Sequence, residues 1–130
     1  MSMSSIETSA SALTAQRLRM DLIANNLANA ETTRTPDGGG PYQRMQAIFE
    51  AAADGGVVVR EVQADPRPPQ LVYQPGHPDA DAHGYVAMPN VNTVEEMTDL
   101  IAATRSYEAN VTALNASKAM TRKALEIGRG

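Results

Sequence analysis

The chain has 130 residues, a net charge of −4 and no cysteine or tryptophan, and only 4% of its residues are aromatic. Its length limits it to one ordinary domain, and the lack of cysteine excludes disulfides, thiolate chemistry and cysteine-ligated zinc. No long basic run provides the electrostatic footprint of a nucleic-acid-binding protein, and no apolar run approaches the roughly 20 residues that span a bilayer.

The first predicted element is one long helix over residues 3–30. A mainly apolar set of residues recurs alternately three and four positions apart, which is the 3.5-residue period of a coiled-coil seam. The seam positions are Met3, Ile6, Ala10, Leu13, Arg17, Met20, Ala24 and Leu27. Arg17 is expected either to meet a carboxylate of a partner or to extend its head into water. Leu18, Leu22 and Ile23 add apolar surface outside the seam, which predicts a second buried face.

Three asparagines, Asn25, Asn26 and Asn29, stand near the end of this helix. Asparagine disfavours helix interiors because its side chain competes for backbone hydrogen bonds, although one alone could serve as a C-cap. Three amides on several faces indicate a crowded contact in which every donor and acceptor must be paired. We therefore predict that these amides determine how the helix end docks against neighbouring chains.

The middle of the chain is predicted to contain loops and short strands. Residues 31–41 are rich in Thr, Pro and Gly and form a loop. The predicted strands cover residues 42–50, 57–63, 71–73 and 84–88, with a hairpin turn at 54–56. Residues 64–83 are mainly loop. The sequence does not decide whether residues 42–88 form a true sheet.

A second long helix is predicted over residues 93–127. Thr93 is a plausible N-cap, with Glu96 three residues later as in a capping box, and Gly128 is a reasonable stop. One stripe of the helix carries Met97, Leu100, Ile101, Tyr107, Val111, Leu114 and Leu125, whereas Met120, Ala124 and Ile127 fall on another face. This helix is therefore also expected to have two buried sides.

The predicted fold class is mainly α. Long N- and C-terminal helices form an antiparallel coiled-coil-like pair, with a small irregular β-containing middle segment. The predicted units are residues 1–30 (N-terminal helix), 31–92 (loop and short strands) and 93–130 (C-terminal helix). Two helices alone make a thin core and leave their second faces exposed, and extended apolar surfaces usually mark interfaces. The sequence thus predicts a subunit whose core is completed by neighbours.

Two other classes of function remain open from the residues alone. The stretch GHPDADAHG contains His77, Asp79, Asp81 and His83, which are residue types that can ligate a divalent metal in a small metal-dependent enzyme. However, their spacing matches no established ligand template, and a Pro-rich loop does not impose a coordination geometry, so a solvated turn is favoured. The second alternative is a cytosolic coiled-coil adaptor or export chaperone, which would form a stable helical dimer.

The stretch SALTAQRLRMDLIANNLANAETTRTPDGGGPYQR resembles the N-terminal signature of the bacterial flagellar axial proteins. Together with PGHPDADAHGYVAMPNVNTVEEMTDLIAATRSYEANVTALNASKAMTRKALEIG, it resembles the proximal-rod proteins of the flagellar basal body along nearly the whole chain. The resemblance is weakest over residues 50–70. It implies a structural protein with no catalytic, cofactor-binding or metal residue. In this family the terminal helices form the tubular core of the rod, which is a drive shaft, and the middle segment packs outward.

The resemblance also implies partners and a location. The implied partners are other copies of the chain, sibling rod proteins, membrane-ring and export-gate components at the rod base, and the flagellar type III export apparatus. Nucleic acid and direct membrane insertion are not implied. The implied location is the periplasmic rod of the basal body, reached without a cleaved signal peptide. The N-terminal residues agree with this because they lack a positive n-region and an apolar h-region.

The family motif includes Asn25, Asn26, Asn29, Tyr107, Asn110, Val111 and Leu114. Glu31 departs from the motif and places a negative charge at a helix C-terminus, where the helix dipole disfavours it. A basic partner is expected there, either Arg34 or a residue of a neighbour.

We predict that torque passes through helix–helix contacts between subunits. The predicted assembly interface comprises Ile6, Leu13, Arg17, Met20, Ile23, Asn25, Asn26, Leu27, Asn29, Met97, Leu100, Ile101, Tyr107, Asn110, Val111, Leu114, Met120 and Leu125.

Overall fold

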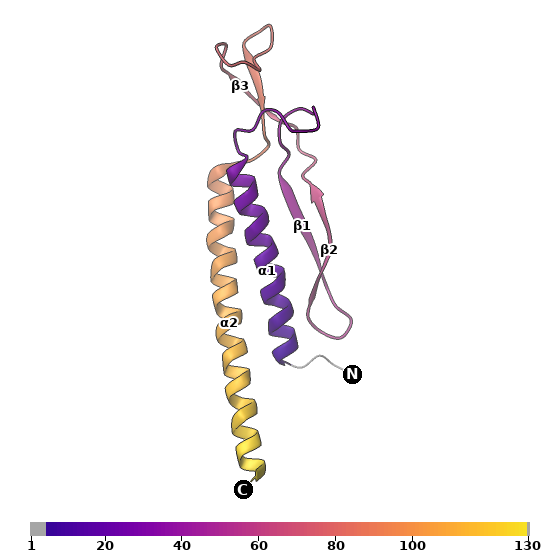
Figure 1. The fold of residues 1–130 in the computed structure, drawn as a ribbon, viewed down its shortest axis with the longest axis vertical. Coiled ribbons are helices and arrows are strands. Elements are labelled where there is room, and N and C mark those ends of the chain that lie inside the picture. Colours follow the sequence, from indigo (N-terminus) through magenta and orange to yellow (C-terminus); the bar gives the residue numbers. More distant parts are fainter. Residues whose placement is uncertain (1–4, 130) are drawn as a thin grey trace.

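The computed structural model describes residues 5–129, and the predicted seam residue Met3 lies outside them. Two long helices enclose, in sequence, two pairs of short strands (Figure 1). The elements are α1 (Ser5–Ala28), β1 (Met45–Ala51), β2 (Val57–Ala64), β3 (Gln70–Tyr73), β4 (Tyr85–Met88) and α2 (Thr93–Arg129). Two terminal helices with a small β-containing middle are therefore confirmed.

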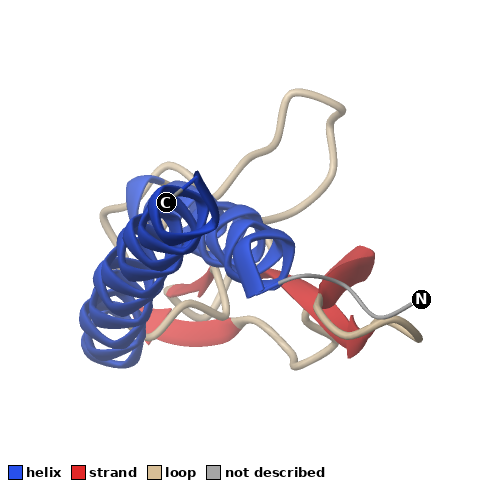
Figure 2. Cartoon of the chain, turned by 90° about the horizontal axis from the view of Figure 1, so that it is seen from below, coloured by secondary structure: helices blue, strands red, loops and turns tan. Residues whose placement is uncertain are grey.

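The two helices lie side by side and run in opposite directions, and α1 lies between α2 and the β1–β2 hairpin (Figures 1 and 2). Helix α2 has 37 residues and α1 has 24, so at about 1.5 Å per residue α2 is longer by roughly 20 Å. The C-terminal part of α2 extends past the described start of α1 (Figure 1). No helix within residues 5–129 is long and apolar enough to cross a membrane.

Each pair of strands forms a separate two-stranded antiparallel sheet. Strand β1 pairs with β2 from Met45↔Ala64 to Ala51↔Val57, with a register shift between Ile48 and Phe49. The turn between them uses Gly55 and Gly56 at φ values of 92° and 124°, which residues with a Cβ rarely adopt. The hairpin predicted at 54–56 is therefore confirmed.

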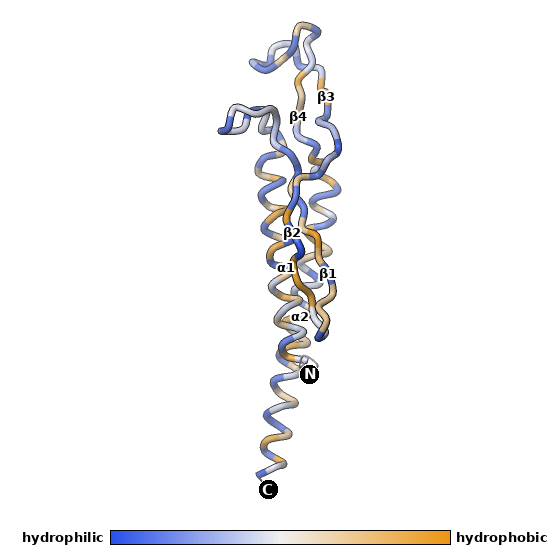
Figure 3. The backbone as a smooth tube through the Cα atoms, turned by 90° about the vertical axis from the view of Figure 1, so that its right-hand side faces the viewer, coloured by the Kyte–Doolittle hydropathy of each residue, from blue (hydrophilic) through white to orange (hydrophobic). Residues whose placement is uncertain are grey.

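The β3–β4 hairpin forms the end of the molecule opposite the C-terminus (Figures 1 and 3). Its register pairs Tyr73 with Tyr85, and the two rings contact edge to face with centroids 5.3 Å apart. Leu71 and Tyr73 remain 71% and 62% exposed. Cross-strand aromatic pairs of this kind stabilise short hairpins that otherwise have little core beneath them.

The core is small and unusually polar. Its buried apolar residues are Ala15, Ile23, Val86, Val91 and Ala103, and its buried polar residues are Asn26, Asp65, Asn90 and Glu96. Glu96 and Asn26 are among the largest fully buried side chains. Buried polar groups must be paired with one another to be tolerated, so hydrogen bonds have a central part in holding this fold together.

The ends of α2 differ from the prediction. Asn92, not Thr93, caps the helix, because its Oδ1 accepts hydrogen bonds from the backbone N–H groups of Val94 and Glu95, both at 3.1 Å. Glu96 does not complete a capping box, since its side chain is drawn into the core by Arg44. Gly128 does not stop the helix either, because α2 continues to Arg129.

The predicted coiled-coil seam of α1 is not confirmed. Ala10, Arg17 and Ala24 of that seam are exposed, whereas Ala15, Ile23 and Asn26 are the buried residues of the helix. The buried positions of α1 follow from two neighbours, α2 and the β1–β2 hairpin, which cover different sides of it. Helix α1 carries apolar residues on several sides. Their spacing in the sequence alone therefore does not identify the face that α2 covers.

Candidate assembly surfaces and the polar junction beside them

A cluster of hydrogen-bonded side chains lies where the end of α1 meets the starts of β1 and α2. We call it the polar junction; it comprises Asn26, Tyr42, Arg44, Asp65, Asn90 and Glu96. It joins residues up to 70 positions apart in the sequence. The exposed helical surfaces described below extend away from this junction, which therefore positions them.

Asn26 is the amide at the centre of the junction and is 0% exposed. Its Nδ2 donates to the Met45 carbonyl and its Oδ1 accepts from the Met45 N–H, both at 2.9 Å. The side chain therefore pairs with the first residue of β1 as a neighbouring strand would. Its Oδ1 also accepts from the Tyr42 hydroxyl at 2.7 Å, and its Nδ2 donates to Glu96 at 3.4 Å.

Arg44 is the cation of the junction. Its Nε donates to the Glu96 carboxylate, and its Nη1 lies 3.3 Å from Asp65 Oδ2. Burial acts to lower the pKa of Arg44, but the hydrogen bond and charge of Glu96, with those of Asp65, raise it above its ordinary value. The side chain of Glu96 is 2% exposed, so this ion pair is largely shielded from water.

Asp65 and Asn90 connect the loop after β2 to the polar junction. Arg67 Nη2 donates to Asp65 at 2.8 Å, and this hydrogen bond holds the pKa of the Asp65 carboxyl below its usual value. Asn90 accepts from the Arg44 N–H at 2.7 Å and donates to the Asp65 and Arg67 carbonyls at 3.1 and 2.9 Å. The junction therefore contains two carboxylates, each paired with an arginine.

Near the β3–β4 hairpin, a second polar contact joins the loop after α1 to the loop before β4. Asp79 accepts from the Thr33 hydroxyl at 2.6 Å and pairs with Arg34. The hydrogen bond from Thr33, followed by that from Arg34, lowers the pKa of Asp79. Arg34 is thus occupied by Asp79 and does not pair with Glu31, so a basic residue of a neighbour remains the predicted partner of Glu31. The described residues contain no group of three or more His, Asp or Glu side chains arranged to hold a metal.

An exposed apolar stripe follows the first turns of α2. Val94, Met97 and Ile101 are spaced by three and four residues, so they share one face of the helix, and they are 72%, 57% and 57% exposed. Leu100 is half-buried instead. A row of large apolar side chains in water is the kind of surface that marks an interface.

The last turns of α2 form a second exposed surface, and every residue from 118 to 129 is exposed. Met120, Leu125 and Ile127 are 72%, 62% and 74% exposed. We call residues 118–129 the C-terminal segment. It includes Lys118, Arg122, Lys123, Glu126 and Arg129, so it is basic overall, whereas the whole chain has a net charge of −4.

The predicted interface residues fall into three groups. The exposed residues are Arg17, Asn25, Met97, Ile101, Met120 and Leu125. The half-buried residues are Ile6, Leu13, Met20, Leu27, Asn29, Leu100, Tyr107, Asn110, Val111 and Leu114. The buried residues are Ile23 and Asn26. The last two cannot contact a neighbour from these positions and are removed from the prediction.

The role predicted for the asparagine amides also needs correction. Asn26 is fully satisfied within its own chain, Asn25 donates to the Tyr42 hydroxyl at 3.0 Å, and Asn29 donates to the Asn25 carbonyl at 2.9 Å. Asn26 therefore docks the end of α1 onto its own β1 and α2, whereas Asn25 bonds to the loop before β1. No local sequence signal marks Tyr42 and Glu96 as partners of these amides, or Arg44 as the partner of Glu96, because contacts between distant segments form only when the chain folds.

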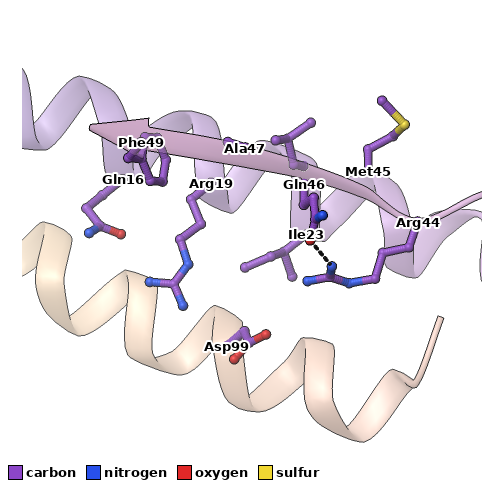
Figure 4. A pocket seen from close by; sticks show the side chains of 10 residues that line it. Gln16, Arg19, Ile23, Arg44, Met45, Gln46, Ala47, Phe49 and Asp99 are labelled. Atoms are coloured by element: carbon purple, nitrogen blue, oxygen red, sulfur yellow. Dashed lines mark hydrogen bonds between the residues drawn. The ribbon is translucent and has the colours of Figure 1, made fainter. Parts of the chain in front are cut away.

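A groove runs along α1 between β1 and α2 (Figure 4). It has a volume of about 290 Å³. Its apolar lining includes Leu22, Ala47 and Phe49, and its polar lining includes Gln16, Arg19 and Asp99. The Gln16 Oε1 atom is buried and has no hydrogen-bond partner among the described residues.

Comparison with known proteins gives matches at both ends of the chain and along its length. Residues 6–34 match the family described as Flagella basal body rod protein, and residues 82–127 match Flagellar basal body rod FlgEFG protein C-terminal. The chain is 46% identical to the flagellar basal-body rod protein FlgC of Borreliella burgdorferi, covering 98% of this chain and 97% of that protein. It is 49% identical to FlgC of Escherichia coli, with 92% of each chain covered, and 46% identical to FlgC of Bacillus subtilis, with 96% and 97% covered.

Proposed function

Because this chain belongs to the FlgC family of flagellar basal-body rod proteins, and is a structural subunit of the rod and not an enzyme, we propose that it transmits torque through contacts between helices of adjacent subunits. The observation that carries this proposal is the exposed apolar surface on α2. Val94, Met97 and Ile101 near its start, and Met120, Leu125 and Ile127 near its end, lie in water in the isolated chain. Association with neighbours would bury these side chains and so supply a hydrophobic driving force.

The surfaces at the two ends of α2 differ from each other, so two subunits can meet through unlike patches. Such heterologous contacts need not close into a ring and can continue as a helical array. In the proposed arrangement, residues 1–30 and 93–130 build the rod core, and residues 31–92 pack outward. The half-buried and exposed residues of the predicted interface remain candidates for these contacts.

The family places the chain in the flagellar basal body, assembling with other rod and basal-body components. We further propose that it lies in the periplasmic proximal rod and contacts other copies of itself and sibling rod proteins. At the rod base it would meet membrane-ring and export-gate components. Passage through the flagellar type III apparatus without a cleaved signal peptide would bring it there.

Electron microscopy of basal bodies from a strain lacking this chain tests the proposed place in the rod. We expect rings without a complete rod, together with loss of swimming. Complete rods and normal swimming in that strain would overturn the proposal.

A substitution within the apolar stripe tests the contacts themselves. Ile101→Asp places a charge at a 57% exposed position, so it should block rod assembly while leaving the fold of the isolated chain intact. Ala53→Asp, which adds the same charge in the exposed β1–β2 turn, is the matched control and should assemble normally. Normal rods in the Ile101→Asp strain would exclude the stripe from the subunit contacts.

A further inference from the structure

The groove between β1 and α2 carries two charges that its own chain leaves unpaired. Arg19 extends from α1 toward α2, where Asp99 stands at the opposite wall (Figure 4). Neither residue forms an ion pair with any residue from 5 to 129. The lining of the groove also includes the apolar residues Leu22 and Phe49, which we call its apolar floor. It therefore presents a cation, an anion and an apolar floor within one concave surface.

The C-terminal segment carries a matching set on one face. Arg122, Leu125, Glu126 and Arg129 border a common shallow hollow on α2. Their spacing of three or four residues places them on the same side of the helix. Leu125 is 62% exposed, and none of the three charged residues takes part in an ion pair within the described chain.

We propose that the Arg122–Leu125–Glu126–Arg129 face of one copy docks in the Arg19–Asp99 groove of a second copy. This inference rests on the proposed rod function and names the two surfaces of one subunit contact. Leu125 would cover the apolar floor, an arginine of the segment would meet Asp99, and Glu126 would meet Arg19. A donor from the docked segment could also satisfy the Gln16 amide oxygen after rotation of that side chain.

The C-terminal segment of a chain cannot reach the groove of the same chain, so the proposed contact lies between two copies. Asp99 and Leu125 lie on the same continuous helix, so about 1.5 Å per residue separates them by roughly 39 Å. The groove and the segment are different patches, and the contact is therefore heterologous. The copy whose segment docks keeps its own groove free, and the copy whose groove is filled keeps its own segment free, which permits an open array.

The absence of cysteine makes the contact testable by site-specific cross-linking in assembled rods. The test chain carries Ala47→Cys in the groove and Leu125→Cys in the segment, and purified basal bodies are treated with a short bismaleimide. We expect a ladder of covalent oligomers of this chain. The matched control combines Leu125→Cys with Val58→Cys. Val58 pairs with Glu50, so it lies on the face of the hairpin opposite Ala47 and Phe49. The control should give no ladder.

A charge exchange tests the complementarity. Asp99→Arg in the cross-linking chain should reduce the adduct yield about fivefold, which corresponds to the value of a good exposed ion pair. Adding Arg122→Asp and Arg129→Asp should restore most of the yield. Equal yields in all three chains would show that these charges do not pair, and would overturn the proposed alignment.

The outcomes separate this inference from the rod function. Rods that assemble normally in the Ala47→Cys, Leu125→Cys strain and give no adducts would overturn the docking while leaving the rod function in place. Adducts formed only with a different rod protein would also overturn it, because the occupant would not be a second copy. If Ala47→Cys prevents folding as judged by circular dichroism, Phe49→Cys takes its place, because Phe49 lines the same groove and lies on the same face of β1 as Ala47.

Discussion

Asn26 on α1 donates a hydrogen bond to Glu96 on α2 at 3.4 Å, although 70 residues separate them in the sequence. Both residues are almost completely buried, at 0% and 1% exposure. Asn26 also pairs with both backbone groups of Met45, and Glu96 with the guanidinium of Arg44. The two residues therefore join both helices to the first strand at one point. This point fixes the direction in which α2 and its exposed surfaces extend from the rest of the chain.

Replacement of Asn26 by leucine should unfold the junction. Asn26→Leu leaves the Met45 N–H and carbonyl and the Tyr42 hydroxyl without their partner in a buried site. An unpaired buried polar group costs about 1–3 kcal/mol, so we expect the free energy of unfolding to fall by about 3 kcal/mol or more. Urea denaturation followed by circular dichroism measures this. Asn29→Ala, which removes mainly a bond to the preceding helical turn, is the control and should lower stability by less than about 1 kcal/mol. Equal urea midpoints for the two variants would contradict the central role of Asn26.

The Arg44–Glu96 ion pair should show strong coupling in a double-mutant cycle. Loss of one partner leaves the other charge buried and uncompensated, at a cost of about 3–5 kcal/mol. Arg44→Met and Glu96→Leu should each be strongly destabilising, whereas the double variant should be more stable than the sum of the two effects predicts. Thermal or urea unfolding of the four chains gives the coupling energy. Additive effects would mean that Arg44 acts mainly through Asp65 and through Gln46, whose side-chain oxygen accepts a hydrogen bond from Arg44 Nη1 at 3.1 Å.

Gly84 at the β3–β4 hairpin should not tolerate a side chain. Its φ is +86°, and a Cβ there would lie 2.8 Å from the Tyr73 ring and 3.2 Å from Pro75. The left-handed backbone alone disfavours alanine by about 1–2 kcal/mol, so Gly84→Ala should loosen the hairpin and weaken the near-ultraviolet circular dichroism of its tyrosines. Gly76→Ala is the control, because nothing lies within 4 Å of its added Cβ. An unchanged tyrosine signal in Gly84→Ala would show that the turn can rearrange at little cost.

Stability should fall in acid because of Asp65. Its pKa in the folded chain is lowered from the ordinary value of 3.8, chiefly by the hydrogen bond from Arg67, against the opposing effect of burial. A lowered carboxyl pKa stabilises the fold fully above the unfolded value, about pH 4, and this contribution is lost as the pH falls through the folded value. Asp65→Asn should therefore be less stable than the parent at pH 7 but should lose less stability between pH 4 and pH 2. Urea midpoints across that range provide the comparison, and parallel curves for the two chains would exclude this contribution.

Several features could be read from local sequence because they depend on residues close together in the chain. The two helices, the glycine turn of the β1–β2 hairpin and the strands near residues 57–64 and 85–88 follow from periodicity and turn chemistry. The family resemblance was also carried by local motifs, and the relatives confirm it. The N-cap was misplaced by one residue, since both Asn92 and Thr93 are suitable caps and only the geometry of the preceding loop selects Asn92.

The sequence by itself determined that this chain has two long helices around a small β-containing segment, and that it belongs with the flagellar rod proteins. Only the tertiary structure decided which faces of those helices are buried and which partners the polar residues have. Asn26 pairs with Met45 and Glu96, Arg34 pairs with Asp79 and not with Glu31, and Arg17 is exposed. The physical reason is that helix and turn formation depend on neighbouring residues, whereas pairing of buried polar groups depends on segments that meet only when the chain folds.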